Sequence, residues 1–312
     1  MLKFRLFVVA NFLVPHLPTR FLEVVGWLAG LTAFVVARGS RQAVLRNLAI
    51  VCPNLSSHQR GRLAAATFVH AAWGYIELFG IPARSPESMQ HAFPIDGLDR
   101  INDALALGRG LIMVTAHLGP ASYAMQLLAT RGTPISVLVE PLEPPKLHEL
   151  VAGLRGAFGL HMVRAERTAV RYVLAALRRG EIVGIASDRD VAGSGEILPF
   201  FGRPARMTTA AATFALRSGA PILPAFAFRT RLYHGYGYVD EPLEVVGSGD
   251  HAQDVQAMTQ EIITRLERAI RLHPEQWAVF QEIWSKDTPG SASGPRAGAG
   301  TEPSGTMRPG DQ

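Results

Sequence analysis

The sequence predicts an α/β fold: a single domain with a largely parallel sheet flanked by helices, preceded by an apolar N-terminal helical anchor. The chain has 312 residues, of which 48% are hydrophobic, enough for a sizeable core. Through its middle, short apolar runs alternate with helical patterns across short links, the order typical of a parallel sheet. The N-terminal segment, up to residue 37, is mostly apolar.

The N-terminal segment contains two apolar runs, residues 4–14 and 21–37, separated by a proline-containing break. The first is short for a membrane span of about 20 residues, and the second is nearly long enough. Three arginines between positions 38 and 46 follow at once, a flank expected on the cytoplasmic side of a membrane. Because the second run ends in a poor cleavage site, we predict that residues 1–38 are a retained anchor. One span or a pair of interfacial helices would both fit, and helices that simply pack on the domain are the alternative.

Residues 39–287 are expected to form the α/β domain. Residues 39–80 have a helical pattern broken at 53–57, with Ser56 or Ser57 as a plausible N-cap for the second helix. Helices are then predicted at 98–107, 122–129, 147–158, 169–178, 208–217 and 254–272, and strands at 111–115, 135–139, 161–163, 182–186, 221–229 and 236–246, the last reached through a hairpin at 234–235.

Residues 288–312 are rich in Gly, Pro, Ser and Ala without periodicity, so we predict a disordered tail.

The composition favours a membrane surface as partner. The net charge is +5 and the mean hydropathy +0.14, a combination that suggests an anionic partner. The sequence shows no helix-turn-helix, no zinc signature and no interleaving of basic and aromatic residues, which argues against nucleic acid. The lone Cys52 excludes an intrachain disulfide and a cysteine-based zinc cluster. We predict no metal and no cofactor.

His117 is the first candidate catalytic residue. It follows the apolar strand pattern 111–115, and a Gly119-Pro120 break separates it from the helical pattern that begins at Ser122. This order puts an imidazole at the carboxyl end of a buried strand, where open α/β sheets place their ligands. Because the pKa of histidine lies near working pH, His117 is suited to act as a general base; a structural histidine is the alternative.

A second candidate cluster, Asp188-Arg189-Asp190, follows the strand pattern 182–186. The two carboxylates could orient a base, or hold the arginine for an anionic head group; a neutralised turn is the alternative. Downstream, Arg203 and Arg206 precede a predicted helix start, a place suited to phosphate, although solvated surface arginines are equally compatible.

These motifs, in this order, resemble the bacterial lipid A (lauroyl/myristoyl) acyltransferase family and its phosphatidylinositol mannoside acyltransferase relatives, within the lysophospholipid acyltransferase group. The residues that carry the resemblance are Arg46-Asn47-Leu48, His117, Asp188-Arg189-Asp190, Phe200-Phe201-Gly202, Ala220-Pro221-Ile222-Leu223-Pro224 and Pro274-Glu275-Gln276-Trp277. The resemblance implies acyl transfer from acyl-CoA or acyl carrier protein to a hydroxyl of a membrane glycolipid or lysophospholipid. It also implies a place at the cytoplasmic face of the cell (inner) membrane.

The resemblance assigns His117 to the histidine of the family's His-x4-Asp/Glu motif, the base that deprotonates the acceptor. Ser122 stands where the motif has its carboxylate. In the serine-protease triad, a neutral replacement of the orienting carboxylate costs about four orders of magnitude in rate. We therefore hypothesise that another carboxylate, Asp188 or Glu196, partners His117.

The candidate catalytic residues are thus His117, Ser122, Asp188, Asp190 and Glu196. The candidate substrate-binding residues are Gly119, Glu140, Arg189, Arg203 and Arg206, with Glu140 also a reserve candidate for the missing carboxylate.

Two other functions remain open at this point. Ser122 is compatible with a catalytically impaired relative that binds lipid. The same base could instead activate water in a lipid or thioester hydrolase. A Ser-His hydrolase built on Ser122 is disfavoured, because the sequence lacks a Gly-x-Ser-x-Gly elbow.

Overall fold

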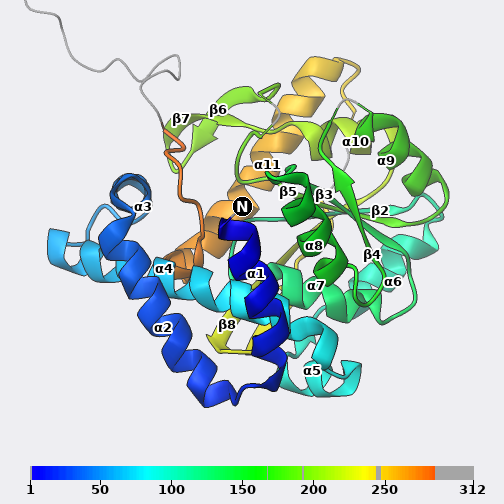
Figure 1. Ribbon diagram of the computed structural model, residues 1–312. Helices are drawn as coiled ribbons and strands as arrows, with labels where there is room; N and C mark the ends of the chain where they lie inside the picture. Colours follow the sequence, from blue (N-terminus) through cyan, green and yellow to red (C-terminus); the bar gives the residue numbers. More distant parts are fainter. Residues whose placement is uncertain (1, 167, 192, 244–246, 285–312) are drawn as a thin grey trace, which may run out of the picture.

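A computed structural model of the chain describes residues 2–166, 168–191, 193–243 and 247–284. It confirms the predicted α/β class: a mostly parallel seven-stranded sheet lies between layers of helices, and apolar helices precede it (Figure 1). The sequence therefore predicted the architecture correctly. Residues 288–312, predicted as a disordered tail, lie outside the described part of the chain.

The sheet has the strand order β1-β9-β8-β2-β5-β3-β4, and its pairs are parallel except for the antiparallel β8–β9 hairpin. The strands are β1 (Ile95–Asp96), β2 (Leu111–Thr115), β3 (Ile135–Val139), β4 (Leu160–Arg164), β5 (Ile182–Ala186), β8 (Ile222–Arg231) and β9 (His234–Val239).

The central strands β2 and β5 pair in register from end to end, with Leu111 opposite Ile182 and Thr115 opposite Ala186. Apart from Thr115 at the end of β2, both strands carry only apolar residues, because helices cover both faces of the sheet. Since the two strands stop side by side, residues that follow them by the same interval emerge at the same edge. His117 and Asp188 each lie two residues past their strand.

Successive residues of β2 point to opposite faces and enter two separate cores. Leu111 and Met113 pack in a cluster with residues of α6 (Leu98–Ala106) and α7 (Ala121–Ala129). Ile112 and Val114 pack with α9 (Ala169–Arg178), α10 (Ala210–Ser218) and α11 (His251–Leu272). The remaining helix of the sheet region, α8 (Pro145–Arg155), packs against β4.

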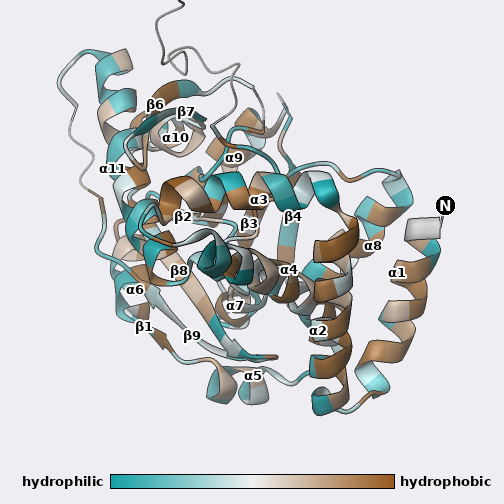
Figure 2. Cartoon of the chain, turned by 90° about the vertical axis from the view of Figure 1, so that its left-hand side faces the viewer, coloured by the Kyte–Doolittle hydropathy of each residue, from teal (hydrophilic) through white to brown (hydrophobic). Residues whose placement is uncertain are grey.

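The N-terminal helices form a layer beside the sheet. They are α1 (Leu2–Leu13), α2 (Thr19–Val36), α3 (Arg38–Val51) and α4 (Ser57–Gly80). The predicted cap of α4 is present: Ser56 and Gln59 form a capping box. Figure 2 shows α1 and α2 at one side of the molecule, mostly hydrophobic in colour.

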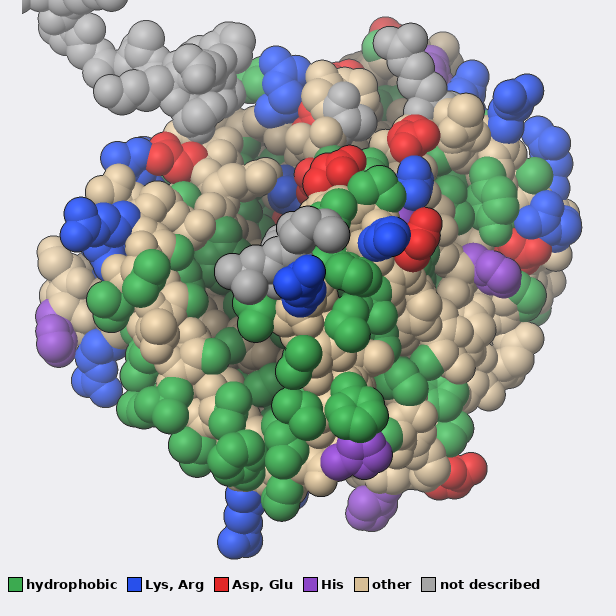
Figure 3. All heavy atoms as spheres, viewed as in Figure 1, with side chains coloured by type: hydrophobic (Ala, Val, Ile, Leu, Met, Phe, Trp, Pro, Cys, Tyr) green, Lys and Arg blue, Asp and Glu red, His purple; other side chains and the backbone are tan. Residues whose placement is uncertain are grey.

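Two glycines let α2 approach α4 closely. A Cβ on Gly30 would lie 2.5 Å from the Cα of Val69, and one on Gly26 would lie 2.3 Å from the Trp73 ring. The other faces of α1 and α2 carry exposed large hydrophobic side chains, and these gather over the lower left and bottom of Figure 3. They are Leu6, Val8, Val9, Phe12, Leu13, Phe21, Val24, Val25, Trp27, Leu28, Val35 and Val36.

Four elements were not predicted, several other bounds differ by one to three residues, and one predicted strand is much shorter than expected. Helix α5 (Pro86–Ala92), the short β1, and a separate antiparallel hairpin of β6 (Glu196–Phe200) and β7 (Arg203–Met207) were not predicted. Both hairpin strands contain a proline, which argues against a strand in sequence. The strand predicted at 236–246 ends at Val239, and its turn falls at positions 232–233 rather than 234–235. Residues 244–246 are not described.

Candidate active site

A cavity of about 520 Å³ opens at the carboxyl edge of the sheet, among β2, β3, β5, α4, α7 and α8. Its lining is mostly apolar. Met113, Met125, Val137, Leu160 and Met162 are among the residues that form its walls. An apolar cavity with a few convergent polar groups is the usual form of a small-molecule or lipid-chain site.

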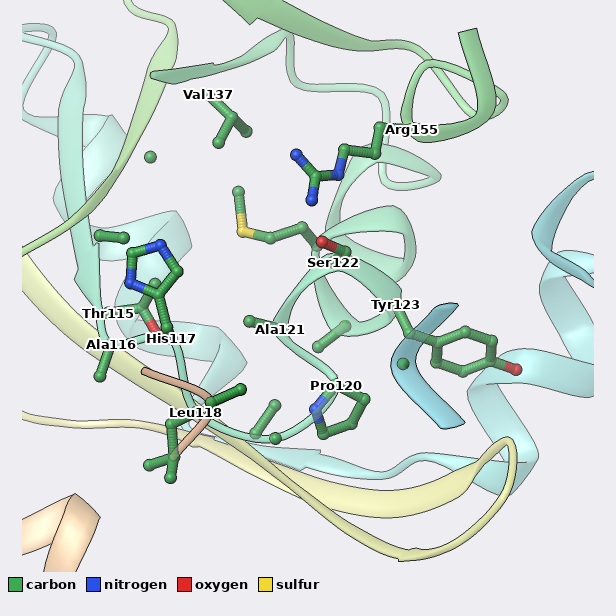
Figure 4. Close-up of a pocket in the computed structure, with 18 of the residues that line it drawn as sticks. Thr115, Ala116, His117, Leu118, Pro120, Ala121, Ser122, Tyr123, Val137 and Arg155 are labelled. Atoms are coloured by element: carbon green, nitrogen blue, oxygen red, sulfur yellow. The ribbon is translucent and has the colours of Figure 1, made fainter. Parts of the chain in front are cut away.

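The His117 loop holds an imidazole toward this cavity (Figure 4). The loop passes so close to β8 that a Cβ on Gly119 would lie 2.1 Å from the carbonyl oxygen of Ala227, and Gly119 has φ +56°. Only glycine fits at this point of the loop. The backbone of His117 is also fixed, because its carbonyl accepts from the Ala278 N–H at 2.8 Å. The imidazole is 35% exposed, so a substrate can reach it.

Asp188 meets the imidazole from the neighbouring strand. Its Oδ1 lies 2.7 Å from His117 Nδ1, and its Oδ2 accepts from the His117 backbone N–H at 3.0 Å. The same Oδ2 accepts from Trp277 Nε1 at 2.8 Å, and the Asp188 side chain is fully buried. The structure therefore brings together the histidine and one of the two carboxylates that the sequence nominated.

Asp188 remains an anion in this buried place. Burial by itself raises the pKa of the carboxyl group, but the charge of His117 and the hydrogen bonds from His117 and Trp277 outweigh it and hold the pKa below its ordinary value. An ionised Asp188 only accepts hydrogen bonds, so the imidazole carries its proton on Nδ1. Nε2 is then free to accept a proton.

Ser122 lies in the first turn of α7 and lines the same cavity (Figure 4). Among the described residues, no hydrogen bond joins its hydroxyl to His117. Position 122 therefore carries a neutral residue, and the carboxylate at the imidazole comes from the segment that follows β5 and not from α7.

The other nominated residues divide into two groups. Gly119, Glu140 and Arg189 line the cavity, and Arg189 pairs with Glu140 at 2.8 Å. The remaining four are not among the residues that line it. Asp190 Oδ2 accepts from the Gly195 N–H at 2.8 Å, Arg206 donates to the Gly195 carbonyl at 2.8 Å, and Glu196 and Arg203 are exposed on β6 and β7.

Arg155, the last residue of α8, is a cavity residue that sequence reasoning missed. Its guanidinium points into the cavity across from His117 (Figure 4), and its buried Nε has no hydrogen-bond partner. Burial lowers its pKa from the ordinary value. No described carboxylate forms an ion pair with it. The sequence carries no signal for this placement, because an arginine near the end of an amphipathic helix is normally exposed to solvent.

A buried ion pair on the α4 side of the cavity was also missed. Arg229 of β8 and Glu77 of α4 pair at 2.6 Å, with side chains 1% and 3% exposed. Arg229 also donates to Nδ1 of His70 at 3.1 Å. Burial, followed by the charges of Arg229 and His273, lowers the pKa of His70 to about 3, so this imidazole is neutral. These contacts join the N-terminal helical layer to the sheet.

This arrangement can perform base-assisted attack on an acyl compound. It has an imidazole oriented by a carboxylate, an apolar cavity suited to a hydrocarbon chain, and a guanidinium that faces the imidazole across that cavity. Within the described residues, no group of three His, Cys, Asp or Glu side chains is placed to hold a metal ion.

Comparison with known proteins shows the family to which the chain belongs. The family model described as bacterial lipid A biosynthesis acyltransferase matches residues 2–286, so the chain belongs to this family of acyltransferases.

Several relatives are similar over much of their length. A phosphatidylinositol mannoside acyltransferase of Mycobacterium tuberculosis is 29% identical over 68% of this chain and 66% of its own length, slightly less than two thirds. A protein of the same name from Mycolicibacterium smegmatis is 25% identical over 81% of this chain and 83% of its own. The lipid A biosynthesis lauroyltransferase of Escherichia coli is 25% identical over 85% of both.

Proposed function

We propose that this protein transfers a fatty acyl chain from an acyl thioester to a hydroxyl group of a membrane glycolipid or lysophospholipid. The observation that carries the proposal is the His117–Asp188 pair at an apolar cavity, in a chain of the lipid A acyltransferase family. The donor is acyl-CoA or acyl carrier protein. His117 is the general base.

The reaction proceeds by direct attack. Nε2 of His117 takes the proton of the acceptor hydroxyl while the acceptor oxygen bonds to the thioester carbonyl carbon. The carbon–sulfur bond then breaks, and the thiol group leaves with the proton that His117 carries. Asp188 keeps the proton on Nδ1 and stabilises the imidazolium that forms between these steps. No acyl-enzyme is formed.

Negative charge develops on the thioester oxygen during the attack, and two features of the cavity would stabilise it. The first-turn amides of α7, at positions 121 and 122, have no acceptor within their own helix. Arg155 supplies a positive charge opposite His117. The same guanidinium would also attract a phosphate group of an anionic lipid, because arginine binds phosphate well.

The acceptor is a lipid, and α1 and α2 provide a surface for reaching it. By length and composition, α2 is the one described helix capable of crossing a membrane, and 17% of it is buried inside the protein. Its close packing on α4 through Gly26 and Gly30 favours an interfacial hairpin over a separate span. We propose that residues 1–38 hold the domain of residues 39–287 at the cytoplasmic face of the inner membrane.

The acceptor class separates two branches of the family. Relatives are named for phosphatidylinositol mannosides and for lipid A. The sequence Asp188-Arg189-Asp190 followed by Ser194-Gly195 favours the mannoside branch, so a mannosylated phosphatidylinositol is the first acceptor to test.

Lipid mass spectrometry of a deletion strain tests the proposal. We expect one glycolipid to lose a single acyl chain and to regain it when the wild-type gene is restored, but not with His117→Ala. An unchanged lipid profile would contradict the proposal. In the purified system, release of free fatty acid without an acylated product would point to a hydrolase, and lipid binding without turnover to an impaired relative.

A further inference from the structure

We propose that Trp277 is a positioning residue of this site: its indole N–H fixes the Asp188 carboxylate that orients His117. The inference rests on the proposed acyl transfer and adds a residue to which no role has yet been given. Trp277 does not touch the cavity; it acts through Asp188.

Asp188 accepts three described hydrogen bonds, and two of them come from His117 itself. The third, from Trp277 Nε1 to Oδ2, is the one described donor outside His117. The imidazole donor turns with the ring, whereas the His117 backbone N–H and the indole N–H are both held in place, and both donate to Oδ2. The indole is therefore the one side chain, among the described residues, that fixes the rotation of the carboxyl group about its Cβ–Cγ bond independently of His117.

The indole is itself held in place. Trp277 is 3% exposed, and its ring meets the edge of Phe200 with centroids 6.0 Å apart. Its backbone forms an antiparallel bridge with Leu118. On either side of that bridge, the Gly119 N–H donates to the Gln276 carbonyl at 3.0 Å, and the Ala278 N–H donates to the His117 carbonyl at 2.8 Å. The segment 276–278 therefore fixes the base through its backbone and the carboxylate through its indole.

Trp277→Phe separates these two contributions. Phenylalanine can keep the packing on Phe200 and leaves the backbone bridge intact, but it removes the N–H. The buried carboxylate then loses one of its donors, so the His117–Asp188 pair holds a proton more tightly. We expect the acid limb of the pH profile of kcat/KM to move to higher pH by about one unit, and kcat to fall about tenfold. Both changes correspond to the free energy of about one hydrogen bond to a charged group.

Other charges face the pair but do not change in this variant. They are Arg155 of α8, the Arg189–Glu140 pair at the cavity, and the Arg229–Glu77 pair on the α4 side, beside the neutral imidazole of His70. A shift of the acid limb therefore reports on the indole contact.

Trp284→Phe is the matched control. Trp284 stacks on the same Phe200 ring at 5.3 Å, and its indole donates to the Phe200 backbone carbonyl at 3.1 Å instead of to a catalytic group. Thermal unfolding and pH profiles are measured for both variants. If loss of an indole destabilises the protein, we expect the loss in both variants. We expect the acid limb of the kcat/KM pH profile to shift in Trp277→Phe alone.

Two further measurements test the role of Trp277. In an Asp188→Asn background, Trp277→Phe should not shift the acid limb of the pH profile, because the carboxylate whose charge the indole stabilises is gone. Titration of the His117 imidazole by NMR, in protein without substrate, should show a higher pKa in Trp277→Phe than in the wild type. The NMR result does not need turnover, so it stands even if the wild-type protein shows no acyl transfer. An unchanged imidazole titration with an unchanged acid limb would overturn the role of Trp277, as would an equal shift of the acid limb in the Asp188→Asn background.

Discussion

Replacing Asp188 by Asn is the sharpest perturbation of this site, because the geometry determines which way the new amide turns. Oδ2 accepts two hydrogen bonds, from the His117 backbone and from Trp277, whereas Oδ1 accepts one, from His117 Nδ1. An amide has one oxygen. We expect it to face the two donors, which leaves the NH2 group facing Nδ1.

That orientation reverses the imidazole tautomer. Nδ1 must then accept a hydrogen bond, so the ring proton moves to Nε2, where it blocks proton removal from the acceptor hydroxyl. Loss of the orienting carboxylate in a serine-protease triad costs about 10⁴ in rate, equal to about 5 kcal/mol of transition-state stabilisation. We expect a fall of about 10³ to 10⁴ in kcat with little change in KM, because Asp188 does not line the cavity.

The assay is transfer of a radiolabelled acyl group from acyl-CoA to a lipid acceptor in mixed micelles. Asp190→Asn is the control, since this neighbouring carboxylate holds the Gly195 N–H and makes no described contact with His117. Activity within tenfold of wild type in Asp188→Asn, or an equal loss in Asp190→Asn, would refute the assignment.

Three other predictions test separate parts of the structure. Arg155→Met should lower kcat/KM at least tenfold, whereas Arg164→Met, which changes an exposed arginine, should not. A lower kcat would indicate that Arg155 stabilises the transition state, and a higher KM would indicate that it binds substrate. An unchanged kcat/KM would contradict a role for Arg155. Because unfolded His70 takes up a proton near pH 6.5 and folded His70 only near pH 3, wild-type stability should fall as pH drops through this window, by up to about 3 kcal/mol at pH 4. His70→Gln should remove that loss in acid unfolding curves, and an unchanged pH dependence would contradict the burial argument. Gly30→Val should destabilise the protein by about 1 to 3 kcal/mol in thermal unfolding through its clash with Val69, whereas Gly39→Val, which meets nothing within 4 Å, should not; equal effects would contradict the close packing of α2 on α4.

The sequence predicted most of the sheet because buried parallel strands are continuous apolar runs. β2, β3 and β5 were placed at their observed bounds. The proline-containing hairpin β6–β7 has no such signal, and its charged strands predict a loop. The prediction of the fold class therefore rested on β2, β3 and β5, whose apolar patterns are the strongest.

The sequence reduced the candidate partners of His117 to a few carboxylates, but it could not show that Asp188 is the partner. Both residues follow a strand by two positions, yet the order of strands in the sheet, which makes β2 and β5 neighbours, is not written in either segment. Glu196 remained a candidate because the sequence predicted no element between residues 186 and 208, and so did not place this carboxylate on a hairpin.

Arg155 and Trp277 could not have been assigned from sequence at all. Each role depends on contacts between segments far apart in the chain: a helix end facing the His117 loop, and an indole reaching a carboxylate 89 residues away.

The central claim is that a lipid hydroxyl, activated by His117, attacks an acyl thioester directly. The most direct measurement is transfer of labelled acyl groups from acyl-CoA or acyl carrier protein to mannosylated phosphatidylinositol by the purified wild-type protein and by His117→Ala. We predict an acylated lipid product with the wild type, none above background with His117→Ala, and no acylated protein by mass spectrometry. Wild-type rates in His117→Ala, or a covalent acyl-enzyme, would contradict the account.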